Sequence, residues 1–378
     1  MEQVVSKSFR KQPPVLFMLP SFPQEPRTGG EIYHRKVIDG LVSDGWDVEV
    51  AALDDMLSGR SIHDPAHRAS ASQALCSLLE SHGDRDTVVI YDSWLYRVIP
   101  RGAWKFRKAY RLVSLSQLCY WDTYRSIPSR LKHRLLTLFA LSPAQMRIGV
   151  SRAVLAADLT RWSSRSRVIY PGCDYAGKEL AQADCTLMPA QILSVGNYGP
   201  RKGFHVLVSA LAGLFALEPG LRGSVALRCV GNLDFDRTYV KRLESMVREL
   251  SLEDAVIFDS WKDREQLSTL FSQSQLFMLA SESEGFGMVV LEAMLHGLPV
   301  AINSFMTAEE LIGRDGTAGW AVRGNDPQGF TRALREYFTR SDRTAMGRSA
   351  QKRAGETAQN WDAVCRQFAE VIGGEDGR

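Results

Sequence analysis

Metal-binding and disulfide patterns are missing from this sequence of 378 residues. Its six cysteines form no C-x-x-C pair and have no histidines at the spacing of a zinc site. A disulfide framework and a structural zinc site are therefore excluded. The scattered cysteines are typical of a protein from a reducing compartment, and no metal site is predicted.

Long apolar runs are missing as well. No segment approaches the ~20 consecutive apolar residues of a membrane-spanning helix. The apolar run at 15–19 is shorter than the core of a signal peptide and is better explained as a buried strand. We therefore predict a cytoplasmic protein, and the alternative of one that lies at the inner face of the plasma membrane stays open.

The sequence also lacks low-complexity stretches, short repeats and a large net charge. Apolar residues make up 45% and charged residues 24%, which is the composition of a soluble globular protein. The net charge of +3 hides an uneven distribution. Residues 1–175 carry 24 basic and 17 acidic side chains, or +7, whereas residues 176–378 carry 22 and 26, or −4.

Short apolar runs alternate with longer amphipathic stretches, such as the one over 31–43. The predicted strands are 15–19, 48–52, 88–91, 111–115, 147–150 and 168–170 in the first half, and 191–195, 225–230, 256–258, 276–279 and 300–302 in the second. Alternation of this kind predicts an α/β fold with parallel sheets covered by helices.

The alternation is interrupted once by a polar, Gly- and Pro-marked segment. We predict one α/β domain over 1–172, a linker over 173–190 and a second α/β domain over 191–356. Two such domains place a cleft between them, and ligands of open α/β sheets bind at the carboxyl ends of the strands.

The strongest local signal is the segment 281–300, SESEGFGMVVLEAMLHGLPV. After a predicted strand, a polar loop contains Gly285 and Gly287, and helical periodicity then runs from Val289 to Leu295. Glycines directly before a helix let a ligand approach backbone N–H groups, where the helix dipole favours negative charge. The segment therefore predicts a phosphate or diphosphate site.

Two carboxylates flank this predicted anion site. Glu284 stands in the loop, and Glu292 lies one turn inside the helix. Carboxylates repel phosphate but suit hydroxyl groups, such as those of a sugar and a ribose. The alternative is that Glu284 is a solvated loop residue and Glu292 a surface residue. Their position on either side of the glycines favours the binding role.

A second loop carries two adjacent cations. The predicted strand 191–195 runs into a Gly/Asn/Pro loop that ends in Arg201-Lys202-Gly203, and a helix begins at about Phe204. Cations at this edge would face the phosphate site and neutralise a departing nucleoside diphosphate. The alternative is a solvated Arg-Lys pair.

These motifs resemble a known family. EGFGMVVLEAM at 284–294, followed by HGLPV, is similar to the Glu-seven-residues-Glu motif of retaining GT-B glycosyltransferases of the family-4 type, also called glycosyl transferases group 1. The resemblance covers nearly the whole second half and is thinner in the first. Its other segments are LSVGNYGPRKG at 193–203, VGN at 230–232, GG at 29–30, GVSR at 149–152 and PGCD at 171–174.

The resemblance implies a GT-B fold, in which two Rossmann-like domains face each other across a cleft and a C-terminal helix, here about 357–378, packs back on the first domain. It implies metal-independent transfer, with a nucleotide-diphosphate sugar as co-substrate and no other cofactor. Arg201 and Lys202 would balance the diphosphate, Glu284 would orient the donor sugar and Glu292 would bind the ribose. The other donor-binding residues that it implies are Gly30, Gly196, Asn197, Gly231, Gly285, Phe286, Gly287, Met288 and Val289.

Two positions depart from the family pattern. The family usually has Gly-Arg where this chain has Gly196-Asn197, so either Arg201 compensates or the diphosphate is held by one cation fewer. Many relatives have a His after the strand at 111–115, where this chain has Ser116 and then Gln117. The predicted acceptor residues are Gly29, Asp92, Ser116 and Asp122. Either carboxylate could help an acceptor hydroxyl lose its proton, and a hydrogen-bonding or helix-capping role is the alternative for each.

The positive charge of the first half is concentrated at 97–134, a segment that contains ten basic residues and one acidic residue, Asp122. Within this segment Leu131, Leu135, Leu138 and Phe139 recur at helical spacing with Arg and Lys between them. A basic amphipathic helix can lie on an anionic membrane. The alternative is a stripe that faces the core and leaves the basic face solvated. We predict contact of 97–141 with an anionic membrane or acceptor, and no nucleic-acid binding, because no such motif is present.

Together these features predict a retaining glycosyltransferase that moves a sugar from a nucleotide-diphosphate sugar to a hydroxyl of a cell-envelope glycan, a lipid-linked acceptor or another acceptor. The alternatives are a phosphorylase or epimerase of the same fold, and a non-catalytic nucleotide-sugar-binding protein. The base, the sugar and the oligomeric state are not determined by the sequence. Trp261, after the strand at 256–258, is either a base-stacking residue or a core residue.

Overall fold

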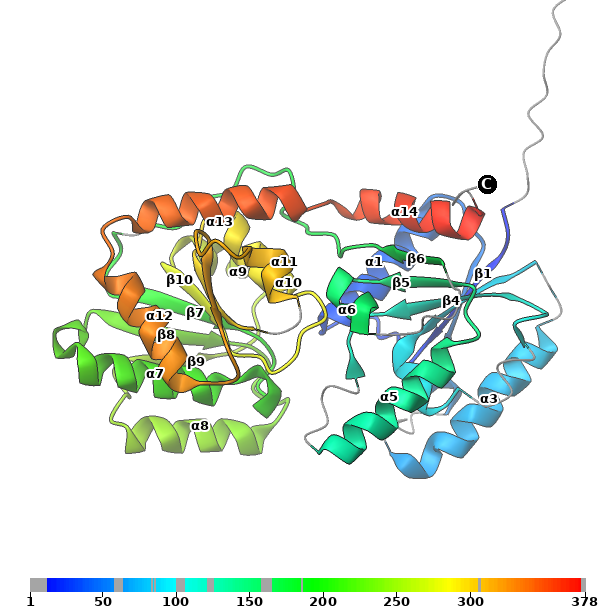
Figure 1. The fold of residues 1–378 in the computed structure, drawn as a ribbon, viewed down its shortest axis with the longest axis horizontal. Helices are drawn as coiled ribbons and strands as arrows, with labels where there is room; N and C mark the ends of the chain where they lie inside the picture. Colours follow the sequence, from blue (N-terminus) through cyan, green and yellow to red (C-terminus); the bar gives the residue numbers. More distant parts are fainter. Residues whose placement is uncertain are drawn as a thin grey trace, which may run out of the picture. The chain divides into compact units, whose positions relative to one another are not determined.

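A computed structural model of the chain describes residues 12–57, 64–82, 84, 86–99, 106–120, 126–157, 165–184, 186–304 and 307–374. The chain divides into two compact units (Figure 1). Unit 1 consists of Met1–Pro171 and Trp361–Arg378, and unit 2 of Gly172–Asn360. Each unit contains a six-stranded sheet in which the paired strands are parallel, which confirms the predicted α/β class.

The sheet of unit 1 has the strand order β2-β1-β3-β4-β5-β6. Its strands are β1 (Val15–Leu19), β2 (Val48–Ala52), β3 (Val88–Asp92), β4 (Arg111–Ser116), β5 (Met146–Gly149) and β6 (Arg165–Val168). The helices are α1 (Gly29–Ser43), α2 (Leu53–Met56), α3 (Arg68–Ser81), α5 (Ile127–Leu141), α6 (Arg152–Ala157) and α14 (Trp361–Gly373), with short 3-10 turns at η1 (Pro65–His67) and η2 (Ser93–Arg97).

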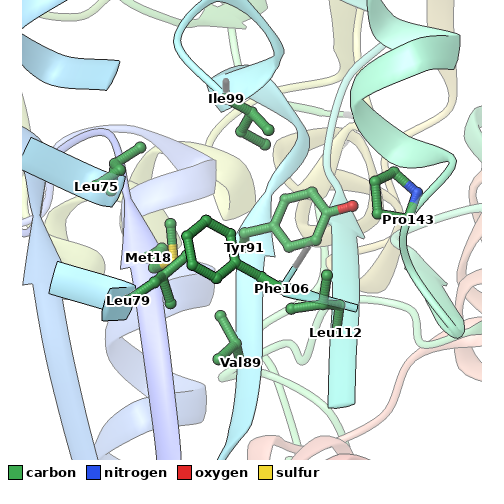
Figure 2. Close-up of a pocket in the computed structure, with 9 residues that line it drawn as sticks. All are labelled: Met18, Leu75, Leu79, Val89, Tyr91, Ile99, Phe106, Leu112 and Pro143. Atoms are coloured by element: carbon green, nitrogen blue, oxygen red, sulfur yellow. The ribbon is translucent and has the colours of Figure 1, made fainter. Parts of the chain in front are cut away.

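One face of the unit 1 sheet packs against α3 and η2 in an apolar core. This core contains a small pocket whose walls carry no charged side chain (Figure 2). Its lining residues are Met18, Leu75, Leu79, Val89, Tyr91, Ile99, Phe106, Leu112 and Pro143. Even the hydroxyl of Tyr91 is engaged, because it donates to the carbonyl oxygen of Ala140 at 3.1 Å. The pocket is therefore part of the packing of unit 1 and has none of the chemistry of the predicted sites.

The last helix, α14, returns to unit 1 and packs on α1. Tyr33 of α1 makes edge contacts with Trp361 and Phe368, with ring centroids 6.0 and 5.9 Å apart. The helices approach closely at Gly40, where an added Cβ would lie 2.2 Å from the sulfur of Cys365. None of the described helices is long and apolar enough to cross a membrane.

The sheet of unit 2 has the strand order β12-β11-β10-β7-β8-β9. Its strands are β7 (Ala190–Val195), β8 (Val225–Val230), β9 (Val256–Asp259), β10 (Leu276–Leu279), β11 (Val300–Asn303) and β12 (Gly319–Val322). The helices are α7 (Phe204–Leu217), α8 (Arg237–Glu249), α9 (Arg264–Ser272), α10 (Met288–Leu295), α11 (Ala308–Ile312), α12 (Pro327–Thr339) and α13 (Arg343–Thr357), with 3-10 turns at η4 (Pro200–Lys202) and η5 (Pro219–Leu221).

Helices α7, α8 and α12 share one apolar core with the unit 2 sheet, while α13 packs on α10 and α11. Read from β9, the strand order is the 3-2-1-4-5-6 order of the Rossmann fold, counted within the unit. The order reverses between β7 and β10, which are neighbours in the sheet. In unit 1 the corresponding reversal lies between β1 and β3.

Residues 172–184, which include most of the predicted linker, belong to unit 2. The hydroxyl of Tyr175 donates to the carbonyl oxygen of Arg264 at 2.8 Å, and its ring meets His296 edge-on. The amide of Ala183 donates to the carbonyl oxygen of His296 at 2.9 Å. This segment therefore runs along α9 and the end of α10.

Two secondary-structure predictions were wrong in detail, and one strand was not predicted. The strand predicted at 168–170 lies three residues earlier, as β6, because its exposed Arg-Ser-Arg start has no apolar run. The single helix predicted from 357 is broken, since α13 ends at Thr357 and Ala358 is extended before α14 begins. The short strand β12 was missed.

Candidate active site

The loops that follow β7 and β10 meet at the point where the strand order of unit 2 reverses. Parallel strands bring their carboxyl ends to the same edge, and ligands of open α/β sheets bind at such a reversal. The loop after β7 contains the predicted Arg201 and Lys202, and the loop after β10 contains the predicted Glu284. The topology therefore brings the two strongest sequence signals together.

The loop after β7 is held close to the sheet by glycines. A Cβ on Gly231, which follows β8, would lie 1.9 Å from the carbonyl oxygen of Gly196, so the ends of β7 and β8 approach too closely for any other residue. The side chain of Lys202 passes over Gly196, and its Cδ lies 3.1 Å from the position of an added Cβ. Beside them the hydroxyl of buried Tyr198 donates to the carbonyl oxygen of Cys229 at 2.7 Å.

Lys202 and Arg201 both face Glu284. The Nζ atom of Lys202 donates to Oε1 of Glu284 at 2.5 Å, and Nη1 of Arg201 lies 3.8 Å from the same oxygen. Arg201 also donates to the carbonyl oxygen of Ser283, and the amide of Glu282 donates to the carbonyl oxygen of Arg201 at 2.9 Å. The two loops are therefore joined by an ion pair, by one hydrogen bond from the Arg201 side chain and by one backbone hydrogen bond.

The charges of Lys202 and Arg201 determine the ionisation of Glu284. Burial alone would raise the pKa of Glu284, but the nearby charges of Lys202 and Arg201 outweigh it and hold the pKa below its usual value. Glu284 is therefore an ionised carboxylate at neutral pH. Lys202 and Arg201 thus place two cations beside Glu284, and cations are the side chains that bind an anionic ligand.

The first turn of α10 borders the same loop. Gly287 has a φ of +89° and precedes the helix as its N-cap, without a side chain that caps the helix. The amides of Val290 and Leu291 donate to the carbonyl oxygen of Gly287, so the amides of Met288 and Val289 are the first two N–H groups of the helix. Phe286 is buried, and its carbonyl oxygen accepts from the hydroxyl of Thr307 at 3.2 Å. Such a helix start favours an anion.

Glu292 lies in a different environment from Glu284, on the α10 side that faces residues 172–184. Asp174 of that segment forms an ion pair with Arg264. Burial, together with the charge of Asp174 and partly offset by Arg264, raises the pKa of Glu292 to about 7. The two carboxylates of the motif therefore differ in charge near neutral pH, because one is paired with a lysine and the other is half-buried near an acid.

Replacing Glu292 by glutamine is expected to stabilise the protein in a pH-dependent way. The pKa of Glu292 in the fold is about 7 and lies above its unfolded value, so its stabilising contribution is lost as the pH rises towards 7. The glutamine variant has no charge to bury. The free energy of unfolding of the variant, minus that of the parent, should increase by roughly 1–3 kcal/mol as the pH rises from 4.5 to 8. Denaturant unfolding at both pH values measures this difference.

Glu249→Gln is the control, because Glu249 is exposed at the end of α8. Its effect on the free energy of unfolding should not change over the same pH range. A Glu292→Gln variant whose advantage is the same at pH 4.5 and at pH 8 would show that the carboxyl is not buried.

The predicted residues of unit 1 lie at the carboxyl edge of its sheet. Gly29 and Gly30 begin α1, whose N-terminus has a capping box between Thr28 and Glu31. Asp92 ends β3 and Ser116 ends β4, and both side chains are buried. Asp122 lies outside the described residues, as do residues 100–105 and 121–125 of the basic segment.

The sequence analysis missed His34, one helical turn after Gly30 in α1. Its Nε2 atom lies 3.1 Å from Oδ2 of Asp92 and 2.6 Å from Nε2 of Gln117, and it is 4% exposed. Gln117 also reaches the carbonyl oxygen of Gly30 at 3.4 Å. No sequence motif marks His34, because its partners come from β3 and from the residue after β4.

Two units with Rossmann-like parallel sheets, one with two adjacent cations at its strand reversal, are typical of the GT-B class of fold. The chain is similar to sucrose-phosphate synthase from Thermosynechococcus elongatus, with a TM-score of 0.75 over 95% of this chain and 98% of that one at 19% identity. It is also similar to Anabaena HepE, solved in complex with UDP and glucose, with a TM-score of 0.69, 20% identity and coverage of 95% and 99%. At these identities the likeness shows the fold.

Residues 180–360, which lie in the second unit, match the family Glycosyl transferases group 1. Among curated relatives, it is 28% identical over 234 residues to a protein of Salmonella typhimurium named putative colanic acid biosynthesis glycosyltransferase WcaL. That alignment covers 60% of this chain and 51% of the relative, so the chain spans about half the length of the relative. The match agrees with the family resemblance that the second half of the sequence shows.

Proposed function

We propose that this chain is a retaining glycosyltransferase that moves a sugar from a nucleotide-diphosphate sugar to a hydroxyl of a cell-envelope glycan or lipid-linked acceptor. The observation that carries the proposal is the contact of Lys202 with Glu284 at the strand reversal of unit 2, beside the start of α10. This arrangement offers cations and helix amides to a diphosphate, and a carboxylate to sugar hydroxyls.

The leaving group is the part of the reaction that this site serves best. As the bond between the sugar and the diphosphate breaks, negative charge grows on the departing phosphate oxygens. Lys202, Arg201 and the first amides of α10 stabilise that charge from fixed positions, which is more effective than recruiting solvent dipoles. In this proposal they take the place of a divalent ion, so activity in EDTA should equal activity without it.

Hydroxyl recognition falls to the two carboxylates. Glu284, ionised and held by Lys202, accepts hydrogen bonds from the donor sugar. Glu292, with a pKa of about 7, accepts from the ribose in its ionised form. Trp261 is 59% exposed after β9, so it is not a core residue, and its ring is available to stack on the base.

A thermal-shift panel of UDP, GDP, ADP and their sugars tests the donor assignment. UDP and UDP-glucose are the first probes, because HepE was solved with UDP and glucose. A stabilising nucleotide is then assayed with cell-envelope lipids as acceptors, and the anomeric configuration of the product shows whether it is retained. The proposal fails if none of the nucleotides raises the melting temperature. Binding without transfer or hydrolysis would point to a non-catalytic binding protein, and conversion of the donor alone to an epimerase.

The acceptor side of the proposal is membrane contact through α5. Three of the four residues of the apolar stripe face outward: Leu131 and Leu135 are each 57% exposed and Phe139 is 47% exposed, whereas Leu138 is half-buried. Ile127, at the start of the helix, is 80% exposed. The buried residues of the helix are Thr137, Ala140 and Leu141. The stripe is therefore not the core-facing side of the helix, which was the alternative left open by the sequence.

Charge complementarity favours an anionic membrane as the occupant of this stripe. Arg130 and Lys132 are exposed on the same helix, and Lys108 is exposed before β4. Each basic residue near an anionic surface contributes about 1 kcal/mol, and insertion of the apolar side chains adds to that. A lipid-linked acceptor would then meet the protein at the surface where α5 lies.

The double variant Leu131→Glu/Leu135→Glu is expected to lose at least tenfold in affinity for vesicles of phosphatidylglycerol and phosphatidylcholine. It places two carboxylates in the stripe, which removes apolar contact and adds repulsion. Flotation with the vesicles measures binding. The control is Leu217→Glu, a leucine that is 54% exposed at the end of α7 in unit 2 and should leave binding unchanged.

Two outcomes would contradict membrane contact through α5. One is a parent protein that stays in the buffer at low salt. The other is a parent dimer that the double variant converts to a monomer without any effect on flotation, which would assign the stripe to a second copy of the chain.

A further inference from the structure

His34, Asp92 and Gln117 form a buried polar cluster at the strand reversal of unit 1. They come from three elements, α1, β3 and the residue after β4, and are 4%, 2% and 9% exposed. Both oxygens of Asp92 are engaged: Oδ1 accepts from the amide of Trp94 at 2.7 Å, and Oδ2 faces His34 and Gln117. A buried polar group destabilises the fold unless it has a hydrogen-bond partner.

The contacts of the cluster allow two arrangements of protons, because Nε2 of His34 lies near both Gln117 and Oδ2 of Asp92. The Nε2 group of Gln117 has two hydrogens and lies 2.6 Å from Nε2 of His34, 3.3 Å from Oδ2 of Asp92 and 3.4 Å from the carbonyl oxygen of Gly30. An imidazole with its proton on Nδ1 presents a lone pair at Nε2 and accepts the shortest of these bonds. With a proton on Nε2 the imidazole would instead donate to Oδ2 of Asp92, 3.1 Å away, and would not accept from Gln117. The first arrangement is the one that makes His34 a partner of Gln117.

The carboxamide so held lies directly against the start of α1. A Cβ on Gly30 would lie 2.7 Å from Oε1 of Gln117, so the absence of a side chain at Gly30 is what permits the contact. The cluster thereby joins the Gly29–Gly30 turn to the ends of β3 and β4. Because His34 is 4% exposed, it acts on a ligand only through these neighbours.

We propose that His34 is a positioning residue for glycosyl transfer: through Nε2 it holds the Gln117 carboxamide against Gly30 and so fixes the turn that is predicted to meet the donor. This inference rests on the proposed function. It also makes Asp92 a part of this hydrogen-bonded cluster, called the brace below, rather than a group that contacts the acceptor. Both of its oxygens are engaged within unit 1.

Two substitutions of His34 separate the lone pair from the bulk of the ring. His34→Gln has an amide oxygen that reaches about the place of Nε2 and can accept from Gln117, whereas His34→Asn is too short to do so. With UDP-glucose as the probe and no acceptor, UDP release should fall at least tenfold in His34→Asn and stay within threefold of the parent in His34→Gln. The affinity for UDP should stay within twofold in both, because the predicted diphosphate contacts lie mainly in unit 2.

Hydrogen exchange gives a second measurement that does not depend on activity. The peptide that covers residues 28–36 should exchange faster in His34→Asn than in the parent or in His34→Gln. Gly30→Ala should cause the same loss of UDP release, and the double variant with His34→Asn should be no worse than either single one, because both act on one contact.

The proposal is overturned if His34→Asn releases UDP within threefold of the parent, or if exchange in residues 28–36 is unchanged. It is also overturned if His34→Asn and His34→Gln are impaired equally and in proportion to a fall in melting temperature, which would indicate a general loss of stability. If the parent neither binds UDP nor releases it from UDP-glucose, the proposed function fails, and the exchange comparison alone decides the brace.

Discussion

Lys202→Ala is expected to lower the rate of sugar transfer by about 10²–10³-fold, the usual loss when one fixed group that stabilises developing negative charge is removed. Lys202 is the cation in direct contact with Glu284, at 2.5 Å, whereas Arg201 lies 3.8 Å from the same oxygen. Arg201 is also more exposed, at 42% against 18% for the Lys202 side chain. The helix amides and Arg201 remain in the variant, so some activity should persist. Initial rates with the donor from the nucleotide panel measure the loss.

The same substitution also removes the cation that holds Glu284 in its ionised form, so a structural cause of the loss must be separated from a catalytic one. Glu284 would be left partly buried without its closest partner, which destabilises a fold. The double variant Lys202→Ala/Glu284→Gln removes this unpaired negative charge. We expect it to recover the melting temperature but not the rate.

Lys241→Ala, an exposed lysine on α8, is the control for this series and should leave both the rate and the melting temperature unchanged. A Lys202→Ala rate within threefold of the parent would remove Lys202 from the chemistry. Recovery of the rate in the double variant would reduce Lys202 to a structural partner of Glu284.

The site in unit 2 could be predicted from sequence because local rules determine most of it. Gly285 and Gly287 before an apolar helix predict the turn and the helix start, and the strand–loop–helix pattern places Lys202 at the same sheet edge as Glu284. The structure adds what a pattern cannot contain, namely that Lys202 and Glu284 are in direct contact although 82 residues separate them. The different ionisation of Glu292 depends on Asp174 and Arg264, which come from the segment before β7 and from the start of α9.

The elements that sequence analysis missed lack the signals on which it relies. Strand β6 begins with exposed polar residues, and β12 is a four-residue edge strand next to glycine-rich loops. His34 was missed because an isolated histidine in a helix has no motif, and its partners come from β3 and the end of β4. The orientation of α5 could not be settled either, since an apolar stripe has the same spacing whether it faces a core or solvent.

Gly203→Ala is expected to be among the most destabilising single substitutions at the site, by roughly 3–5 kcal/mol. Gly203 joins η4 to α7 with a φ of +71°, in the left-handed region that side chains disfavour. An added Cβ would lie 2.2 Å from the carbonyl oxygen of Ala280, which directly follows β10 and is fully buried. A clash with buried backbone cannot be relieved by a change of rotamer, so the loop that bears Lys202 must move away from the loop that bears Glu284.

Gly223→Ala separates the two causes, because Gly223 has a φ of +80° but nothing within 4 Å of an added Cβ. This control should lose only the cost of the left-handed backbone, about 1–2 kcal/mol, and keep its rate of transfer. Denaturant unfolding of both variants measures the difference that is due to the clash. Equal losses in the two variants would show that the loop after β7 yields freely against β10, and the fixed geometry on which the charge stabilisation by Lys202 depends would then be absent. A larger loss in Gly203→Ala, accompanied by a fall in the rate of transfer, would show that the close approach of these loops stabilises the fold and positions the cations together.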